Sequence, residues 1–277
     1  MSPPENPARR TASYAARGEN GKRYKVRVMA TPEAARQVEM LTNLLHRHAR
    51  GLDPAASFEI PRILGRSECA LVSEWVVGDS ADTTAGLERF AGNLLGRIHT
   101  CPLESDELVA FAGQASEERA ALHRRVDDLL ALGHLSRREA GSVSRWCEEF
   151  RDDSPGAGIV HRDFCPPNLV LDPRGVLWPI DNETLAVRPL DYDLGRTWTH
   201  WSMRPDGWRR FFEGYSHERS PQSYFAHFPY WALTACVESA SFRAVHWTGG
   251  TSRPLQRLRA LLSGLENGSD MRDLVAS

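Results

Sequence analysis

The segment IVHRDFCPPNLVLDPRGVLWPIDNETL, residues 159–185, contains the most informative pattern in the chain. Two apolar runs, Leu169-Val-Leu and Val176-Leu-Trp, flank the tetrapeptide Asp172-Pro-Arg-Gly. A proline at the second position and a glycine at the fourth suit a type I turn. This arrangement predicts a short β-hairpin.

Three polar side chains stand at the open end of this hairpin. Because a hairpin brings its two ends side by side, we expect Asn168 and Asp181 to lie close together, with Asp163 in the preceding loop. Amide and carboxylate oxygens are ligands that Mg²⁺ prefers, and protein-bound Mg²⁺ is usually shared with substrate phosphates. A single Asp or Asn in a loop is more often a cap or turn former, but the joint spacing favours phosphoryl transfer. We therefore predict Asp163 as the catalytic base and Asn168 and Asp181 as metal ligands.

The composition favours a small ligand over a macromolecular one. The chain has 277 residues, of which 41% are hydrophobic, and 34 basic residues balance 36 acidic ones. This balance predicts neither a nucleic-acid partner nor an anionic membrane partner. The N-terminal residues do not resemble a secretory signal, and no apolar run could span a bilayer, so we expect a cytoplasmic protein.

The cysteines are not arranged as a disulfide framework or a zinc site. The five are scattered, odd in number and without a CxxC pair, so we predict reduced thiols. Cys165 alone lies near the hairpin motif, and a lone cysteine is more often buried filler than nucleophile.

The first quarter of the chain is rich in predicted strands. After a tail at 1–12, residues 13–28 form two strands around the turn Asn20-Gly21. Alternation places Lys25 and Arg27 on the face opposite Val26 and Val28. Thr31-Pro32 then starts a helix.

The remainder of the chain is mostly helical in prediction. A buried strand at 69–77 ends at Gly78, where we place the boundary between a small N-lobe (13–77) and a C-lobe (78–277). Helices are predicted at 87–99, 117–132 and 137–150. This order indicates an α+β architecture with a reduced β-sheet lobe and a helical lobe.

The chain resembles the aminoglycoside phosphotransferase and choline kinase family, which is a branch of the protein-kinase fold. The matching residues are His161-Arg-Asp163-Phe-Cys-Pro-Pro-Asn168 for the catalytic loop and Ile180-Asp181-Asn-Glu183 for the second metal motif. Leu71 to Gly78 is similar to the interlobe hinge, Leu94 to His99 to the following helix, and Asp191-Tyr-Asp193-Leu194 to the segment after the metal motif. The resemblance covers roughly residues 20–200.

The resemblance implies a two-lobed kinase-like fold and further site residues. The backbone at Glu74 and Val76 would hydrogen-bond the adenine ring of ATP, or the base of GTP. Asp193 would brace the catalytic loop, and His161 would support the site rather than act as an acid or base. The co-substrate would be a nucleoside triphosphate with Mg²⁺, and the acceptor a hydroxyl of a small molecule.

The small lobe departs from the family pattern. Family members place a lysine on the third strand to bind nucleotide phosphates, held by a helix glutamate. Here the strand is Tyr24-Lys-Val-Arg-Val, so Arg27 would take that place, with Lys25 as an alternative on the same face. Its acidic or polar partner on the helix is open between Glu33, Gln37 and Glu39.

Two other family features are reduced in this chain. The glycine-rich phosphate loop of the family is missing, and about a dozen residues precede the first recognisable strand, so we expect the family's opening strand to be shortened or absent. There is no room for a long activation loop between Asp181 and Asp191, which disfavours a protein substrate.

The acceptor is expected to lie against the C-terminal region. From Asp191 onward there are ten Arg and nine Asp plus Glu, which does not resemble a trap for polycationic aminoglycosides. The same region is rich in aromatic residues, mostly core, of which some could wall an apolar pocket or cage a quaternary amine. A kinase-like binding module with weak or no activity is the alternative to a kinase, and a metal-dependent hydrolase is a third hypothesis.

Overall fold

The computed structural model divides into two compact units that do not follow the predicted boundary after residue 77. The first unit comprises Met1–Leu87 and Pro166–Ala186, and the second comprises Glu88–Cys165 and Val187–Ser277. The predicted tail lies outside the described residues except for Ala12, where the first strand begins. The structure describes residues 12–52, 58–83, 86–103, 114–151, 156–246 and 251–269, without the side chains of 114–118.

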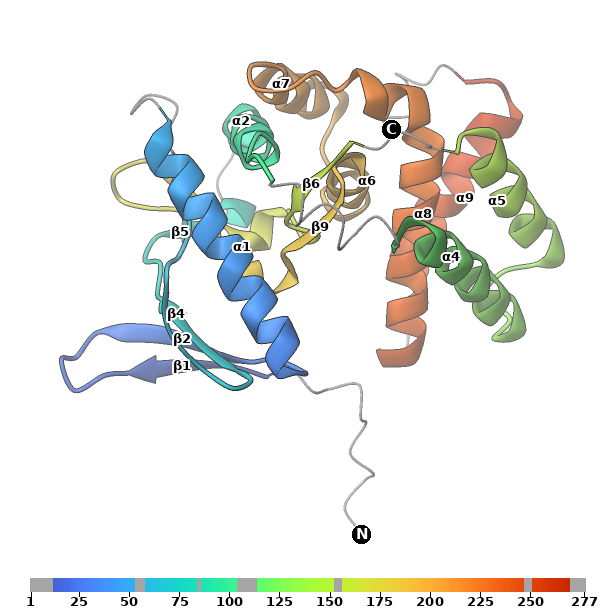
Figure 1. The fold of residues 1–277 in the computed structure, drawn as a ribbon. Helices are drawn as coiled ribbons and strands as arrows, with labels where there is room; N and C mark the ends of the chain where they lie inside the picture. The colour runs from blue at the N-terminus through green and yellow to red at the C-terminus, as the bar shows by residue number, and fades with distance from the viewer. Residues whose placement is uncertain are drawn as a thin grey trace, which may run out of the picture. The chain divides into compact units, whose positions relative to one another are not determined.

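The first unit combines two small antiparallel sheets with one long helix (Figure 1). Its elements are β1 (Ala12–Arg17), β2 (Arg23–Val28), α1 (Pro32–Gly51), β3 (Ile63–Ser67), β4 (Ala70–Glu74), β5 (Asp79–Ser80), η1 (Ala81–Thr83), η2 (Pro166–Asn168), β7 (Leu169–Leu171), β8 (Leu177–Pro179) and η3 (Asn182–Thr184).

The larger sheet has the strand order β1-β2-β4-β3. The predicted turn joins β1 and β2, and Gly21 adopts the positive φ of 74° that such a turn needs. Helix α1 starts at the predicted position, because the Thr31 side chain accepts a hydrogen bond from the Ala34 amide at 3.1 Å. Its buried residues Ala35 and Val38 pack with Met29, just after β2, and with Leu71 of β4. The strand predicted at 69–77 is shorter and ends at Glu74.

The predicted hairpin is present as β7 and β8, and β5 extends it to a three-stranded sheet. The Gly175 amide donates to the Asp172 carbonyl at 2.9 Å, and Gly175 has a φ of 82°. The Asp172 carboxylate accepts the Val176 amide at 2.9 Å, which holds the turn from inside.

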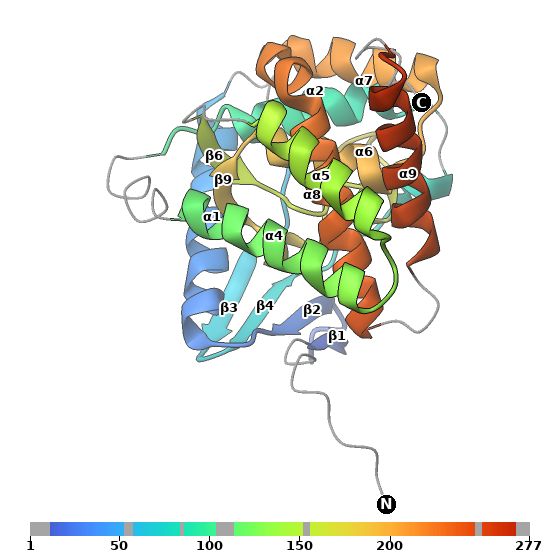
Figure 2. The same cartoon turned by 90° about the vertical axis from the view of Figure 1, so that its right-hand side faces the viewer.

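The second unit is a set of helices with one short two-stranded sheet (Figure 2). Helix α8 packs against α4, α5, α6 and α9. The elements are α2 (Glu88–His99), α4 (Gln114–Ala131), α5 (Arg137–Glu149), β6 (Ala157–Val160), β9 (Ala186–Pro189, whose first residue belongs to the first unit), α6 (Asp191–His200), α7 (Pro205–Ser216), α8 (Gln222–His246) and α9 (Ser252–Glu266).

Helices α2 and α7 approach until their backbones touch. A Cβ added at Gly92 would lie 1.9 Å from the Phe211 carbonyl oxygen, and one added at Gly214 would lie 2.0 Å from the Arg89 carbonyl oxygen. Only glycine fits at these two positions, so this contact depends on both. Beside it lies an aromatic cluster that includes the fully buried Trp208.

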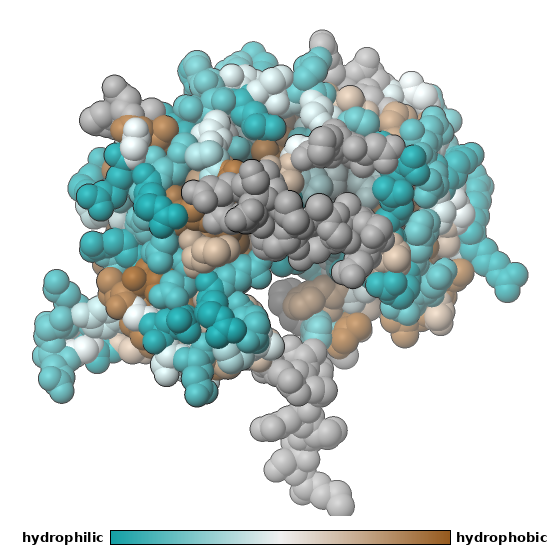
Figure 3. Space-filling model, viewed as in Figure 1, coloured by the Kyte–Doolittle hydropathy of each residue, from teal (hydrophilic) through white to brown (hydrophobic). Residues whose placement is uncertain are grey.

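The α+β class is confirmed by these elements, with the sheets concentrated in the first unit and the helices in the second. Most of the coloured surface in Figure 3 is hydrophilic, with apolar residues in small scattered groups. Among the described helices, none is both long and apolar enough to cross a bilayer. No disulfide joins the five cysteines, all of which the structure describes.

Candidate active site

The first unit contains a cavity of about 290 Å³ on one face of its larger sheet. Alternate residues of β2 and β4 line it, among them Lys25, Arg27 and Leu71, as the predicted alternation requires. The segments after β4 and after β8 complete the lining. Two cationic side chains, residues of the predicted hinge and residues of the predicted metal motif therefore line the same cavity.

The predicted hinge residues Glu74 and Val76 both line this cavity. The Glu74 amide donates to the Arg62 carbonyl at 3.0 Å, and its carboxylate accepts the Arg62 amide at 3.0 Å and the Arg62 Nε at 2.8 Å. Burial alone would raise the pKa of Glu74, but these bonds to Arg62 lower it. The end of β4 is thus held at its backbone and its side chain, and the Arg23 guanidinium lies 3.8 Å from the Trp75 ring centroid in the same segment.

The two cations of β2 bind the acids of the metal motif. The Lys25 ammonium contacts the Asp181 carboxylate and lies 3.6 Å from the Glu183 carboxylate. Arg27 Nη2 lies 2.6 Å from Glu183 Oε1, and Arg27 Nε is buried without a hydrogen-bond partner among the described residues. Two predicted contacts, Arg27 and Asp181, therefore belong to one charged cluster with Lys25 and Glu183.

The helix acids considered as partners for Arg27 bind elsewhere. Glu33 pairs with Arg36 at 2.5 Å, and Glu39 pairs with Arg66 at 2.5 Å. The face of α1 that packs on the sheet is apolar, since Ala35 and Val38 occupy it. Glu183 was missed as a partner, although it lies two residues after Asp181 in the same motif.

Asn168 and Asp181 lie at the same open end of the hairpin. The Ile180 amide donates to the Asn168 carbonyl at 2.8 Å, which places Asn168 just before β7 and Asp181 just after β8. Asn168 is buried, whereas the Asp181 side chain is 40% exposed. Asp181 has a φ of 61°, a left-handed conformation that Asp tolerates better than most residues. The backbone hydrogen bond thus brings the two chain segments that carry Asn168 and Asp181 together.

The second unit holds the other predicted residues around the catalytic loop. Asp193 is fully buried, and its carboxylate accepts the backbone amides of His161 and Arg162, each at 2.6 Å. His99 Nε2 lies 3.2 Å from the same carboxylate, and His99 Nδ1 lies 2.9 Å from the Tyr215 hydroxyl. His161 is buried, with its ring edge-on to Phe164 at 5.8 Å.

The loop that Asp193 holds has an unusual backbone. Arg162 has a φ of 68°, a backbone conformation that residues other than glycine rarely adopt. Its amide is bound to Asp193, and its carbonyl accepts the Arg196 Nε at 3.1 Å. Hydrogen bonds from one helix, α6, therefore fix both sides of the residue that precedes Asp163.

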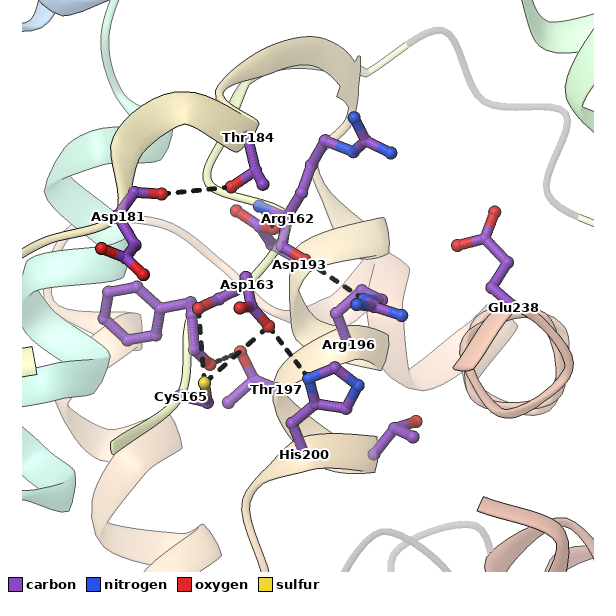
Figure 4. A network of polar contacts seen from close by, with 12 residues as sticks. Arg162, Asp163, Cys165, Asp181, Thr184, Asp193, Arg196, Thr197, His200 and Glu238 are labelled. Atoms are coloured by element: carbon purple, nitrogen blue, oxygen red, sulfur yellow. Dashed lines mark hydrogen bonds and ion pairs between the residues drawn. The ribbon is translucent and has the colours of Figure 1, made fainter. Parts of the chain in front are cut away.

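Asp163 has a partner that the sequence did not indicate. Its Oδ1 lies 3.1 Å from His200 Nδ1 at the end of α6 (Figure 4). Burial alone would raise the pKa of Asp163, but the hydrogen bond from His200 and the positive charge of Arg196 lower it to about 2. Burial lowers the pKa of His200, although Asp163 opposes this, so the ring is neutral at pH 7 and donates its Nδ1 proton to the carboxylate. His200 lies outside every motif, and only the fold brings it here.

Cys165 also lies beside Asp163. Its Sγ is 3.8 Å from Asp163 Oδ1, and Asp163, Cys165 and His200 each offer one ligand atom within 4.8 Å of the others. Such a mixed N, O and S set suits Zn²⁺ better than Mg²⁺, which prefers oxygen. The oxygen-only set is that of Asn168 and Asp181.

Comparisons with known proteins show the family and the fold. A family model described as "Phosphotransferase enzyme family" matches residues 7–229. An ethanolamine kinase of Plasmodium vivax is similar in structure, with a TM-score of 0.64 and 10% identity over 96% of this chain and 86% of that one. A search of curated protein sequences found no match.

Two further solved structures share the fold. A spectinomycin phosphotransferase in complex with ADP and spectinomycin has a TM-score of 0.57 and 14% identity, covering 96% of this chain and 88% of that one. A choline/ethanolamine kinase family protein from Mesorhizobium loti has a TM-score of 0.52 and 18% identity, covering 92% and 87%. At such identities the likeness concerns the fold, and it confirms the predicted kinase-like class.

Proposed function

The chain belongs to the phosphotransferase enzyme family, and from that premise we propose that it transfers the terminal phosphate of ATP or GTP to a hydroxyl of a small molecule, with Mg²⁺. The observation that supports this most is the hairpin that holds Asn168 and Asp181 side by side, with Ile180 N 2.8 Å from the Asn168 carbonyl oxygen. The predicted enzyme class, a phosphotransferase, is confirmed by the family match.

The cavity of the first unit is the proposed nucleotide site. Arg27 has a buried Nε without a partner among the described residues, and Asn182 has a buried Oδ1 in the same condition. Both residues line the cavity, so each offers a polar atom that a ligand would satisfy. Arg27, with Lys25 beside it, would contact the phosphates, and the backbone at Glu74 and Val76 would meet the base. The spectinomycin phosphotransferase that holds ADP supports a nucleotide in this fold.

The proposed metal site is formed by Asn168 and Asp181. The Asn168 amide oxygen and the Asp181 carboxylate are hard donors of the kind that Mg²⁺ takes. The Lys25 ammonium already contacts the Asp181 carboxylate, so a positive charge is favourable beside this carboxylate. Mg²⁺ bound there would neutralise negative charge on the phosphates.

Asp163 is the proposed catalytic base. With a pKa of about 2 it is ionised throughout the physiological range, so it can orient the acceptor hydroxyl and take its proton late in the transfer. His200 Nδ1 lies 3.1 Å from Oδ1, which fixes the orientation of the carboxylate. The Asp193 carboxylate accepts the two amides before Asp163, which supports the bracing role that the resemblance implies.

The acceptor is proposed to be a small molecule such as an antibiotic, an amino alcohol or a sugar. Ethanolamine and spectinomycin, named in the structural relatives, are first candidates to test. The residues between Asp181 and Asp191 form η3 and β9, which disfavours a protein acceptor because no long activation loop is present there. The cytoplasmic location stays a prediction.

The test measures nucleotide binding and turnover separately. Thermal unfolding with ATP or GTP, with and without Mg²⁺, reports binding, and mass spectrometry of an acceptor panel reports transfer. Asp163→Asn is expected to keep the stabilisation by nucleotide and to lower kcat by roughly 10²–10⁴-fold, since it removes the base. Asp206→Asn, at an exposed aspartate of α7, is the matched control and is expected to keep both.

The outcomes distinguish the three functions. Metal-dependent nucleotide binding with acceptor-dependent turnover supports the kinase. Nucleotide binding without turnover, or no response to nucleotide, favours a kinase-like binding module, and phosphate release independent of any acceptor favours a hydrolase. Near-normal turnover by Asp163→Asn would show that another group acts as the base.

A further inference from the structure

Asp163, Cys165 and His200 bring an oxygen, a sulfur and a nitrogen donor to one place in the second unit. His200 Nδ1 lies 3.1 Å and Cys165 Sγ lies 3.8 Å from Asp163 Oδ1, and the three ligand atoms all lie within 4.8 Å of one another. In Figure 4 the contacts from the Cys165 sulfur and the His200 ring meet at the Asp163 carboxylate. Carboxylate, thiol and imidazole are side-chain groups from which zinc sites are built.

The spacing of these donor atoms is close to that of a tetrahedral zinc site. Zinc bonds of about 2.0 Å to oxygen and nitrogen and about 2.3 Å to sulfur, at tetrahedral angles, separate oxygen from nitrogen by about 3.3 Å and oxygen from sulfur by about 3.5 Å. The corresponding distances here are 3.1 Å and 3.8 Å. The sulfur and nitrogen atoms lie within 4.8 Å of each other, so small side-chain rotations suffice to bind the metal, with the fourth position left for water.

The two segments that carry the donors are fixed to each other. The Thr197 hydroxyl donates to the Phe164 carbonyl at 3.0 Å, and Arg196 Nε donates to the Arg162 carbonyl at 3.1 Å. Both donors belong to α6, the helix that ends at His200. The catalytic loop is therefore tied to this helix on both sides of the aspartate, and such support favours metal binding because the ligands are already in place.

Burial and charge also suit a divalent cation. The side chain of Asp163 is 37% exposed, whereas that of His200 is 18% exposed and Cys165 is buried, so a metal can enter past the carboxylate. Asp163 is ionised and His200 is neutral at pH 7, as coordination requires. Zn²⁺ bound to one carboxylate and one thiolate forms a group without net charge, so the nearby Arg196 guanidinium does not exclude it.

We propose that Asp163, Cys165 and His200 form a Zn²⁺ site, and that zinc bound there inhibits phosphoryl transfer by occupying the proposed catalytic base. The inhibition rests on the proposed phosphotransferase function, whereas the metal site does not. On binding, the Cys165 thiol releases one proton and the His200 proton moves from Nδ1 to Nε2. His200 Nε2 has no hydrogen-bond partner among the described residues, so this change breaks no bond at that nitrogen.

The first test detects the sulfur ligand directly. Co²⁺ occupies zinc sites, and its bond to a thiolate gives an absorption band in the near ultraviolet. The whole protein, without nucleotide, is titrated with Co²⁺ and then with Zn²⁺. We expect the band to appear with about one equivalent of Co²⁺, to vanish when Zn²⁺ displaces the cobalt, and to be unaffected by Mg²⁺. Calorimetry of Zn²⁺ binding in two buffers of different ionisation enthalpy should show release of about one proton.

The second test uses variants of the ligands. Cys165→Ser is expected to abolish the cobalt–thiolate band and to weaken Zn²⁺ binding about 100-fold or more, because loss of a ligand costs at least as much as loss of a group that orients one. His200→Leu should weaken Zn²⁺ binding to a similar extent. Cys69→Ser, at a partly exposed thiol between β3 and β4, is the matched control and should keep the band and the affinity.

Two further measurements accompany the variants. A thermal melt of each variant reports folding, and alkylation of Cys165 in the wild type, followed by mass spectrometry, should be slower with Zn²⁺, which requires no variant. Transfer from ATP with excess Mg²⁺ is compared with each protein's own rate without zinc. Zn²⁺ is expected to lower this rate about tenfold or more in the wild type and in Cys69→Ser, but not in Cys165→Ser.

The results separate this proposal from the proposed function. Absence of the thiolate band, or a band and a zinc affinity that Cys165→Ser leaves unchanged, would overturn the site even if transfer occurs. Zinc that binds through Cys165 without slowing transfer would overturn Asp163 as a ligand. Zinc binding through Cys165 in a protein that transfers phosphate to no acceptor would support the site and count against the kinase.

Discussion

The fully buried Asp193 gives the sharpest stability prediction. Asp193→Ala removes the acceptor of two backbone amides, those of His161 and Arg162, and the partner of His99. Each buried donor left without a partner costs roughly 1–3 kcal/mol, so the expected loss is about 3–5 kcal/mol in the free energy of unfolding. For a chain of this size that corresponds to a Tm about 10 °C lower.

The assay combines urea unfolding, followed by circular dichroism, with hydrogen exchange of the peptide that contains residues 159–164. We expect the His161 and Arg162 amides to exchange faster in Asp193→Ala, because the loop is no longer held. Asp193→Asn, which keeps one acceptor oxygen, is expected to lose about half as much stability. Asp206→Ala breaks an exposed ion pair and should cost at most about 1 kcal/mol. A loss below about 1 kcal/mol for Asp193→Ala, with unchanged exchange, would refute this account of the loop.

Four further predictions concern the sites and the helix packing. Lys25→Met removes the ammonium that competes with Mg²⁺ for the Asp181 carboxylate, so the affinity for Mg²⁺ without nucleotide should rise. The KM for ATP should increase about tenfold, because a cation beside the phosphates is lost. Unchanged Mg²⁺ affinity and unchanged KM would contradict the role given to Lys25. His200→Asn retains a hydrogen-bond donor near the Nδ1 position and should keep most of kcat, whereas His200→Leu should lower kcat about tenfold or more. Equal losses of kcat in the two variants would exclude a role of His200 in positioning Asp163. Burial lowers the His200 pKa, so wild-type kcat/KM should be flat from pH 7 to 9 and fall in more acidic buffer as imidazolium forms beside Asp163. The His200→Asn variant should lack this fall. Gly214→Ala should destabilise by about 1–3 kcal/mol or more, because its Cβ would meet a carbonyl oxygen at 2.0 Å, while Gly141→Ala, in open space on α5, should stabilise slightly in the same urea assay.

Local chemistry made much of the fold predictable from the sequence. The Asn20-Gly21 turn and the Thr31 cap depend on neighbouring residues, and both appear in the structure. The helix predicted at 87–99 spans Glu88–His99, and the hairpin predicted around Asp172 is present. Periodicity and turn residues suffice where a few adjacent positions determine the backbone.

The charged partners could not be predicted in this way. Glu183 meets Arg27 from a segment more than 150 positions later in the chain, and the helix acids instead bind arginines near them. His200 reaches Asp163 only because Asp193 and Arg196 anchor α6 to the catalytic loop. Such pairs follow from tertiary packing, for which hydrophobic spacing carries no information.

The discontinuity of the first unit has a consequence for biosynthesis. Its second sheet needs β7 and β8, which the ribosome makes only after the 78 residues from Glu88 to Cys165. Domains commonly fold in the order of their synthesis, starting from the N-terminus. Here the nascent N-terminal unit lacks the acids that Lys25 and Arg27 bind until Glu183 has been translated, so it must wait for a large part of its neighbour before it can close its own charged cluster.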